Sequence, residues 1–190
     1  MSRAFLPNEG FSPVPMMKML LDMFLLRTKP QDLPHSWGLL VGVVALAAAT
    51  DFAGLPDSSP QWGQVLFVFT RPLLYGIVCW LLLKQRGFEA RWVQTVIALF
   101  AALALLSLLR LPLLPALLEM VKQGAEAVLG WEVYLSLLLE LWFLVLVARI
   151  LREALELRPG VSAAICIAVV FSIEILRFIL APWFGLIDPA

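Results

Sequence analysis

The chain has 190 residues, of which 62% are hydrophobic, and its mean hydropathy is +0.92. A soluble domain is about 45–50% apolar and cannot bury this much apolar surface, so the composition predicts an integral membrane protein. Lys and Arg total 14, as do Asp and Glu, and the resulting net charge of zero indicates nothing about partners. The motifs HExxH, GxxxxGK[ST], GxGxxG and GxSxG with triad partners are absent from the sequence. We therefore expect a non-enzymatic protein without a cofactor.

Residues 1–35 are predicted to form a cytoplasmic tail and an interfacial amphipathic helix. The stretch PVPMMKMLLDMFLLRTKP has prolines near both ends, where they suit a first helical turn and a helix stop. It is too short and too charged to cross a bilayer, so we expect it to lie in the membrane interface. The alternative is a helix that packs against a neighbouring domain. The polar face carries Lys18 and Asp22, and the apolar face includes Met19, Met23 and Phe24.

Five longer apolar segments predict a single transmembrane domain, residues 36–190, with an all-α fold. Each approaches the roughly 20 residues that cross about 30 Å of hydrocarbon. Glu119, Lys122 and Glu126 recur at helical spacing between the third and fourth segments, which predicts a short amphipathic helix or a continuation of the third span. The five spans are expected near residues 36–55, 62–83, 92–110, 131–152 and 160–184.

Basic residues predict the orientation of these spans. Ten of them precede span one or lie between spans two and three or four and five, whereas the other connections hold only Arg110 and Lys122. The positive-inside rule then places the N-terminus in the cytoplasm and the C-terminus outside, with Asp51 and Glu132 near the outer face. The Leu-, Ala- and Trp-rich composition indicates a bacterial inner membrane. The basic loops are brief and suit anionic lipid headgroups rather than nucleic acid.

Four charged residues lie inside the predicted spans: Arg71 in span two, Glu140 in span four, and Glu174 and Arg177 in span five. The first three are each nine residues from a tryptophan expected at the outer interface, which is about 13–14 Å, near mid-bilayer. A charge at this depth costs about 2.5–3.5 kcal/mol, so these charges must face one another or water. We predict that Arg71 contacts Glu140 or Glu174. The cluster is either a clamp that fixes helix register or a proton or ion pathway.

Small residues recur at four-residue or closely related spacing in two spans. Such stripes let helix backbones approach closely. They predict either seams within the protein or the face of a homodimer. The stripe in span one consists of Gly38, Gly42, Ala45 and Ala49, and that in span five of Ala164, Ala168 and Ser172.

Metal binding and disulfide formation are not expected. His35 is the single histidine and has no ligand set near it, while the adjacent Ser36 is predicted to cap the start of span one. Cys79 and Cys166 both fall in apolar runs, which is typical of small buried side chains.

The entry to span one resembles that of the Yip1 superfamily of small polytopic membrane proteins. Five spans, a cytoplasmic N-terminus and an acidic-Leu-Pro entry are shared with that family, whose motif is of the type D-L-Y-G-P followed by an aromatic residue. Asp32 and Leu33 match the motif and Trp37 stands for the aromatic, whereas Pro34-His35-Ser36 departs from the Tyr-Gly-Pro part. The resemblance implies the five-span fold. Eukaryotic relatives act in vesicle trafficking and bind small GTPases, a partner that we do not transfer because the core of the motif differs.

Two functions remain open on these grounds. The first is an accessory or scaffold protein that binds membrane lipids and either another integral membrane protein or a second copy of itself. The second is a small transporter or channel that uses the Arg/Glu cluster as a polar pathway.

Overall fold

A computed structural model describes residues 13–54, 62–123 and 130–186, and every regular element in these ranges is a helix. Four helical stretches are long and apolar enough to cross a membrane: Trp62–Gln85, Glu89–Met120, Trp131–Leu155 and Pro159–Phe184. They contain α3 (Trp62–Gln85), α4 (Trp92–Arg110), α6 (Trp131–Leu155) and α7 (Pro159–Leu180). A fifth apolar helix, α2 (Trp37–Ala53), has 17 residues. These properties are those of a membrane protein.

The shorter elements lie between or beside these helices. They are α1 (Pro13–Phe24), η1 (Pro30–Asp32), η2 (Glu89–Arg91), η3 (Leu111–Leu113), α5 (Leu114–Gln123) and η5 (Ala181–Phe184). The helix expected to reach residue 184 changes to the 3-10 turn η5 after Leu180, because Pro182 has no N–H with which to continue the α-helical ladder. Glu119 lies on α5, whereas Glu126 lies outside the described residues.

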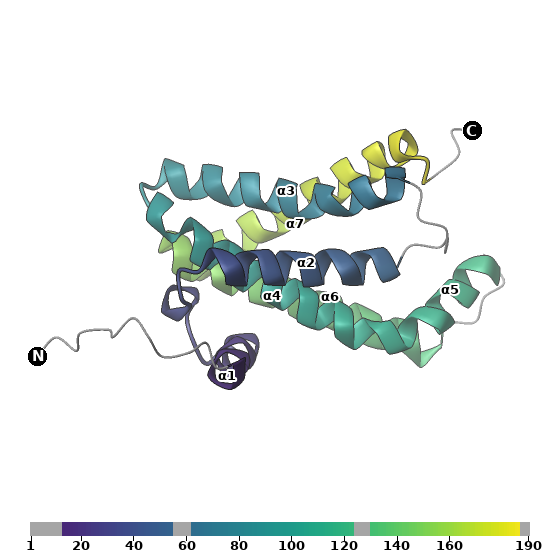
Figure 1. Cartoon of the computed structure of the whole chain (residues 1–190), viewed down its shortest axis with the longest axis horizontal. Coiled ribbons are helices and arrows are strands. Elements are labelled where there is room, and N and C mark those ends of the chain that lie inside the picture. The colour runs from purple at the N-terminus through teal and green to yellow at the C-terminus, as the bar shows by residue number, and fades with distance from the viewer. Residues whose placement is uncertain (1–12, 55–61, 124–129, 187–190) are drawn as a thin grey trace, which may run out of the picture.

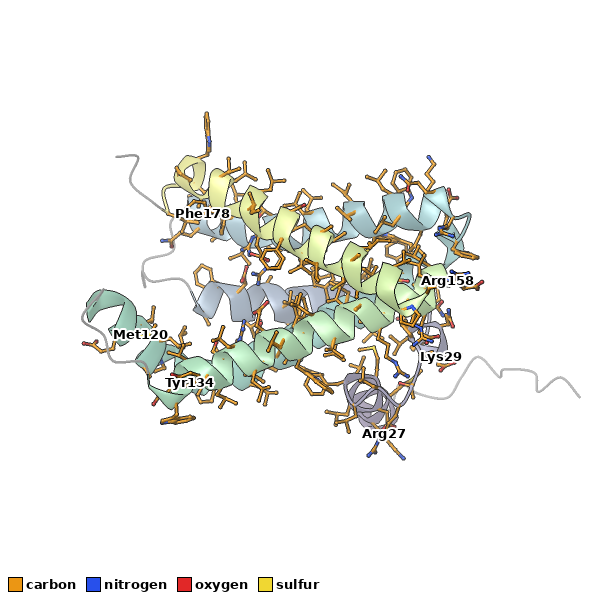
Figure 2. All side chains as sticks on the ribbon, turned by 180° about the vertical axis from the view of Figure 1, so that it is seen from behind. Arg27, Lys29, Met120, Tyr134, Arg158 and Phe178 are labelled. Atoms are coloured by element: carbon orange, nitrogen blue, oxygen red, sulfur yellow. The ribbon has the colours of Figure 1, made fainter. Side chains whose placement is uncertain are left out.

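The five apolar helices run alongside one another with alternating direction (Figure 1). At one end of this bundle lie Lys29 and Arg158, which we call the basic end, and Met120, Tyr134 and Phe178 lie towards the other, the far end (Figure 2). The first residues of α2, α4 and α7 are at the basic end, and the first residues of α3 and α6 are at the far end. Chain direction therefore fixes the depth of every residue along the bundle.

Helix α4 is the centre of the bundle. Its sequence is apolar on all sides, as expected of a helix that is surrounded by others, and twelve of its residues are buried. Ile97, Ala98, Phe100 and Ala102 are completely inaccessible. Alternation of large residues with alanine lets α2, α3 and α6 approach α4 closely.

Helix α2 buries one apolar face, while the face that carries its glycines is exposed. Leu39, Leu40, Val43, Ala47 and Ala48 are buried, mostly in the common core. The predicted small-residue stripe is exposed throughout, and so is the one on α7. Neither stripe forms a seam inside this bundle. The exposed residues are Gly38, Gly42, Ala45, Ala49, Ala164, Ala168 and Ser172.

Helix α1 crosses the bundle near its basic end and is seen end-on in Figure 1. Met23 is buried in the common core, with Met19 and Phe24 packed against it. The Phe24 ring meets Trp142 of α6 edge-on, with ring centroids 6.4 Å apart. Lys18 is exposed, and Asp22 lies 3.9 Å from Arg27. The methionine face, which was expected to meet lipid, thus contacts the protein, because α4 and α6 offer it a complementary apolar surface.

Neutral hydrogen bonds join the segment that enters α2 to the rest of the bundle. The Gln31 side-chain amide donates to the Glu153 carbonyl at 2.6 Å. The Gln94 amide donates to the carbonyls of Gln31 and Leu33 at 3.2 and 2.8 Å. Leu33, the hydrophobic residue of the Asp-Leu-Pro entry, is only 2% exposed. The predicted cap is confirmed, since the Leu39 N–H donates to Ser36 Oγ at 3.3 Å.

Candidate functional site: an ion-pair ring between three helices

Four charged side chains from three helices form a closed ring, which we call the ion-pair ring: Asp51 on α2, Arg71 on α3, and Glu174 and Arg177 on α7. Arg71 donates to Asp51 Oδ1 at 2.9 Å and to Glu174 Oε1 at 3.0 Å. Arg177 donates to Asp51 Oδ2 at 2.7 Å and to Glu174 Oε2 at 3.3 Å. Each carboxylate thus bridges both guanidinium groups, and the ring has no net charge.

Arg177 is the most deeply held member of the ring, with 6% of its side chain exposed. Its Nε donates to Thr70 Oγ1 at 3.4 Å, and its guanidinium carbon lies 4.7 Å from the centroid of the Phe67 ring. Thr70 in turn donates to the Phe67 carbonyl, which fixes its hydroxyl. Hydrogen bonds and an aromatic face therefore surround this charge, as a buried cation requires.

A second ion pair joins α4 to α6. Arg110 donates both to the carboxylate of Glu140 and, at 3.0 Å, to the carbonyl of Ser136. The structure thus gives Arg71 one of its two predicted partners, Glu174, whereas Glu140 is paired with Arg110. Arg110 lies in the last turn of α4, and its long side chain points back along the bundle to the depth of Glu140.

Two polar cavities adjoin these ion pairs. One, of about 280 Å³, is lined by charged and polar groups of four helices together with apolar side chains of α4 and α6. The other, of about 250 Å³, lies at the end of α2 beside Asp51, Thr50 and Gly54. A water molecule occupies about 30 Å³ in the liquid, so each cavity can hold several. The residues that line both cavities are Arg71, Ser107 and Arg110.

Some donors beside the cavities have no hydrogen-bond partner within the described part of the chain. They are the Nε groups of Arg71 and Arg110. The hydroxyl of Tyr75, one turn further towards the basic end and 1% exposed, is likewise without a partner there. Beyond Tyr75 the core of the bundle consists of apolar residues such as Ile97 and Val147. The polar region therefore extends from the far end to about half the length of the bundle.

Asp51 is the functional residue that sequence reasoning missed. It was expected near the outer face because it lies close to the end of the predicted span one, residues 36–55. Its expected depth alone does not predict an ion pair with Arg71. The usable signal is the charge balance of the helices: Arg71, Arg110 and Arg177 need three carboxylates, and Glu140 and Glu174 supply only two.

The single histidine and the two cysteines make packing contacts and a hydrogen bond within the bundle. His35 meets Trp37 edge-on, with ring centroids 6.4 Å apart. Cys79 and Cys166 are buried and unbridged, and the Cys166 thiol donates to the Leu144 carbonyl at 3.3 Å. In residues 13–54, 62–123 and 130–186, no group of three or more His, Cys, Asp or Glu side chains has an arrangement that could hold a metal ion.

Comparison of the chain with protein-family models, with curated proteins and with solved structures gives no match. Inference about function therefore rests on the geometry of the bundle and the chemistry of its side chains.

Proposed function

We propose that the chain is a non-enzymatic, five-span scaffold or accessory protein of a bacterial inner membrane, which binds another integral membrane protein through its helices. The closure of the ion-pair ring is the observation that carries this proposal. Its four charges satisfy one another across α2, α3 and α7, so they fix the relative positions of those helices. A rigid bundle with outward-facing helix surfaces is suited to holding a partner.

The proposed membrane arrangement follows from the positions of the helices and charges. Helix α2, at about 26 Å, is within the range of lengths that span a bilayer, and it lies alongside the four longer helices (Figure 1). Lys29 and Arg158 at one end support a cytoplasmic basic end and a C-terminus outside. The crosswise position of α1 favours an interfacial helix, and the short α5 is proposed to be the second. A Yip1-like assignment is part of the proposal and rests on the resemblance of the entry to span one, through Asp32, Leu33 and Trp37.

Native-detergent purification with mass spectrometry of co-isolated proteins tests the scaffold proposal. We expect one integral membrane protein to be retained by the wild type and lost from Gly42→Leu, because a side chain on the exposed face of α2 blocks close approach of a partner helix. Gly160→Leu is the matched control. An added Cβ meets nothing within 4 Å at either glycine, so neither substitution disturbs the bundle directly. A lone monomer, or equal retention by both variants, contradicts the proposal.

A transporter is the second candidate, and the two polar cavities favour it. They share Arg71, Ser107 and Arg110 in their linings, and each has room for water or a small solute. The apolar core beyond Tyr75 would have to open for a substrate to cross. The test is proton or ion flux in liposomes: flux that disappears in Glu140→Gln, with the protein still folded, replaces the scaffold proposal with this one.

A further inference from the structure

An apolar groove follows the seam between α2 and α3, and we call it the α2–α3 groove. It consists of two cavities of about 530 and 550 Å³ that share Leu40, Val44 and Phe69. The cavity nearer the basic end has α4 as its floor, through Val96 and Phe100. The groove exists because α2 packs mainly on α4 and leaves its side towards α3 partly uncovered.

Small and fixed side chains shape the wall of the basic-end cavity. Pro72 and Gly76 of α3 offer little bulk to it. Trp92 at the start of α4 donates its indole N–H to the Gly76 carbonyl at 2.9 Å, which holds the ring in place as a wall. The cavity is therefore part of the folded bundle rather than the result of one movable side chain.

The basic-end cavity has the length of one bilayer leaflet. Along α3 it extends from Phe69 to Trp80, which are eleven positions apart, or about 16 Å of helix. Half of a hydrocarbon core of about 30 Å is about 15 Å. A single acyl chain from the leaflet at the basic end thus matches the cavity in length and in polarity. A partner helix, about 10–12 Å wide with its side chains, would instead run the full length of both cavities.

The mouth of the groove carries a positive charge at headgroup depth. Trp80, Trp92 and Trp37 gather there, and the latter two rings are 6.0 Å apart. Tryptophans are typical of the membrane–water interface. The Lys84 ammonium group lies 4.5 Å from the centroid of the Trp80 ring, and the side chain is exposed. A phosphate group above a chain seated in the groove would meet this ammonium.

From these observations we infer that the α2–α3 groove binds an anionic phospholipid of the leaflet at the basic end, with an acyl chain between Phe69 and Trp80 and the headgroup on Lys84. The inference does not depend on the scaffold proposal, because the two are tested at different positions: Gly42 does not line the groove, whereas Gly76 does.

Native mass spectrometry of the full chain, titrated with phosphatidylglycerol or with phosphatidylcholine of the same acyl chains, tests the charged end of the site. We expect tighter retention of phosphatidylglycerol. Lys84→Gln should weaken its binding about fivefold and leave phosphatidylcholine unchanged, since one basic residue near an anionic headgroup has an effect of this size. Arg158→Gln removes the same charge from another exposed site at the same end and should have no effect. Equal binding of the two lipids, or equal effects of the two variants, overturns the inference.

A second pair of variants tests the apolar end of the site. Gly76→Leu fills the cavity, and its Cβ would lie 3.8 Å from Trp92, an ordinary contact that the fold can accept. Retention of both lipids should be lost in Gly76→Leu and kept in Gly42→Leu, whereas the proposed protein partner responds to Gly42→Leu. Unchanged lipid retention in Gly76→Leu contradicts the inference. So does a photocrosslinker at Leu73, which lines the groove, if it captures a protein rather than phosphatidylglycerol.

Discussion

The two halves of the bundle are held together by different interactions. In the far half, ion pairs bridge five helices around two polar cavities. In the basic half, an apolar core fills the space between the helices and neutral glutamine–carbonyl bonds attach the segment before α2, while the ion pairs Lys29–Glu153 and Arg91–Glu156 lie at the more exposed periphery. The contrast shows what each kind of polar group needs inside an apolar bundle. A charged group is tolerated where it has partners of opposite sign, whereas a neutral polar group needs only a hydrogen-bond partner.

The largest expected effect comes from opening the ion-pair ring. Arg177→Met leaves Asp51 and Glu174 with a single arginine, and we expect the free energy of unfolding to fall by about 3–5 kcal/mol, as for other broken buried ion pairs. Titration of detergent-solubilised protein with sodium dodecyl sulfate measures it.

The double variant Asp51→Asn/Arg177→Met serves as the control for this effect, because it restores neutrality around Arg71. We expect it to recover part of the stability that the single variant loses. A single variant as stable as the wild type would show that the ring does not hold the far half together.

An intermediate effect is expected in the basic half. Gln94→Leu removes both donors to the carbonyls of Gln31 and Leu33, and we expect a loss of about 1–3 kcal/mol, the usual range for buried acceptors left without a partner. The same denaturant titration measures the loss. Gln85→Leu, at an exposed position of α3, should change stability by less than about 0.5 kcal/mol. Equal effects of the two substitutions would mean that the glutamine–carbonyl bonds add nothing.

The smallest effect is expected at the pair between α4 and α6. Arg110 lines both polar cavities and also donates to the Ser136 carbonyl, so water and that carbonyl can solvate its charge in Glu140→Gln, and we expect the free energy of unfolding to fall by only about 1 kcal/mol. The protein used for the flux measurement would therefore be folded. A loss of stability as large as that of Arg177→Met would show that the pair of Arg110 and Glu140 holds the helices together as strongly as the ion-pair ring does.

The extent of the helices could be predicted from the sequence, because hydrophobic length and interfacial tryptophans are local signals. Span three, expected at 92–110, coincides with α4 (Trp92–Arg110), and the others differ by a few residues at their ends. Counting residues from those tryptophans also brought Arg71 and Glu174 to the same depth, and the two are in contact. Depth along a helix is set by a rise of about 1.5 Å per residue and needs no knowledge of neighbours.

The rotation of each helix about its own axis could not be predicted in the same way. Helix α2 is apolar on nearly every side, so its sequence has no periodic pattern to say which face meets α4. For this reason the small-residue stripe was assigned to an interior seam or a dimer face, and the structure turns it outward. The partnership of Asp51 with two arginines depends on the same rotation.

The sequence by itself determined the membrane class, the helical ranges and the depth of each charge, because these depend on composition and on distance along one chain. Only the tertiary structure decided that Asp51 closes the ion-pair ring, that Glu140 belongs to Arg110, and that a groove runs beside α2. When the surroundings of a helix are as apolar as the bundle core, no difference in polarity sets its rotation about its own axis. Shape and the mutual neutralisation of buried charges orient it instead, and both depend on all five helices together.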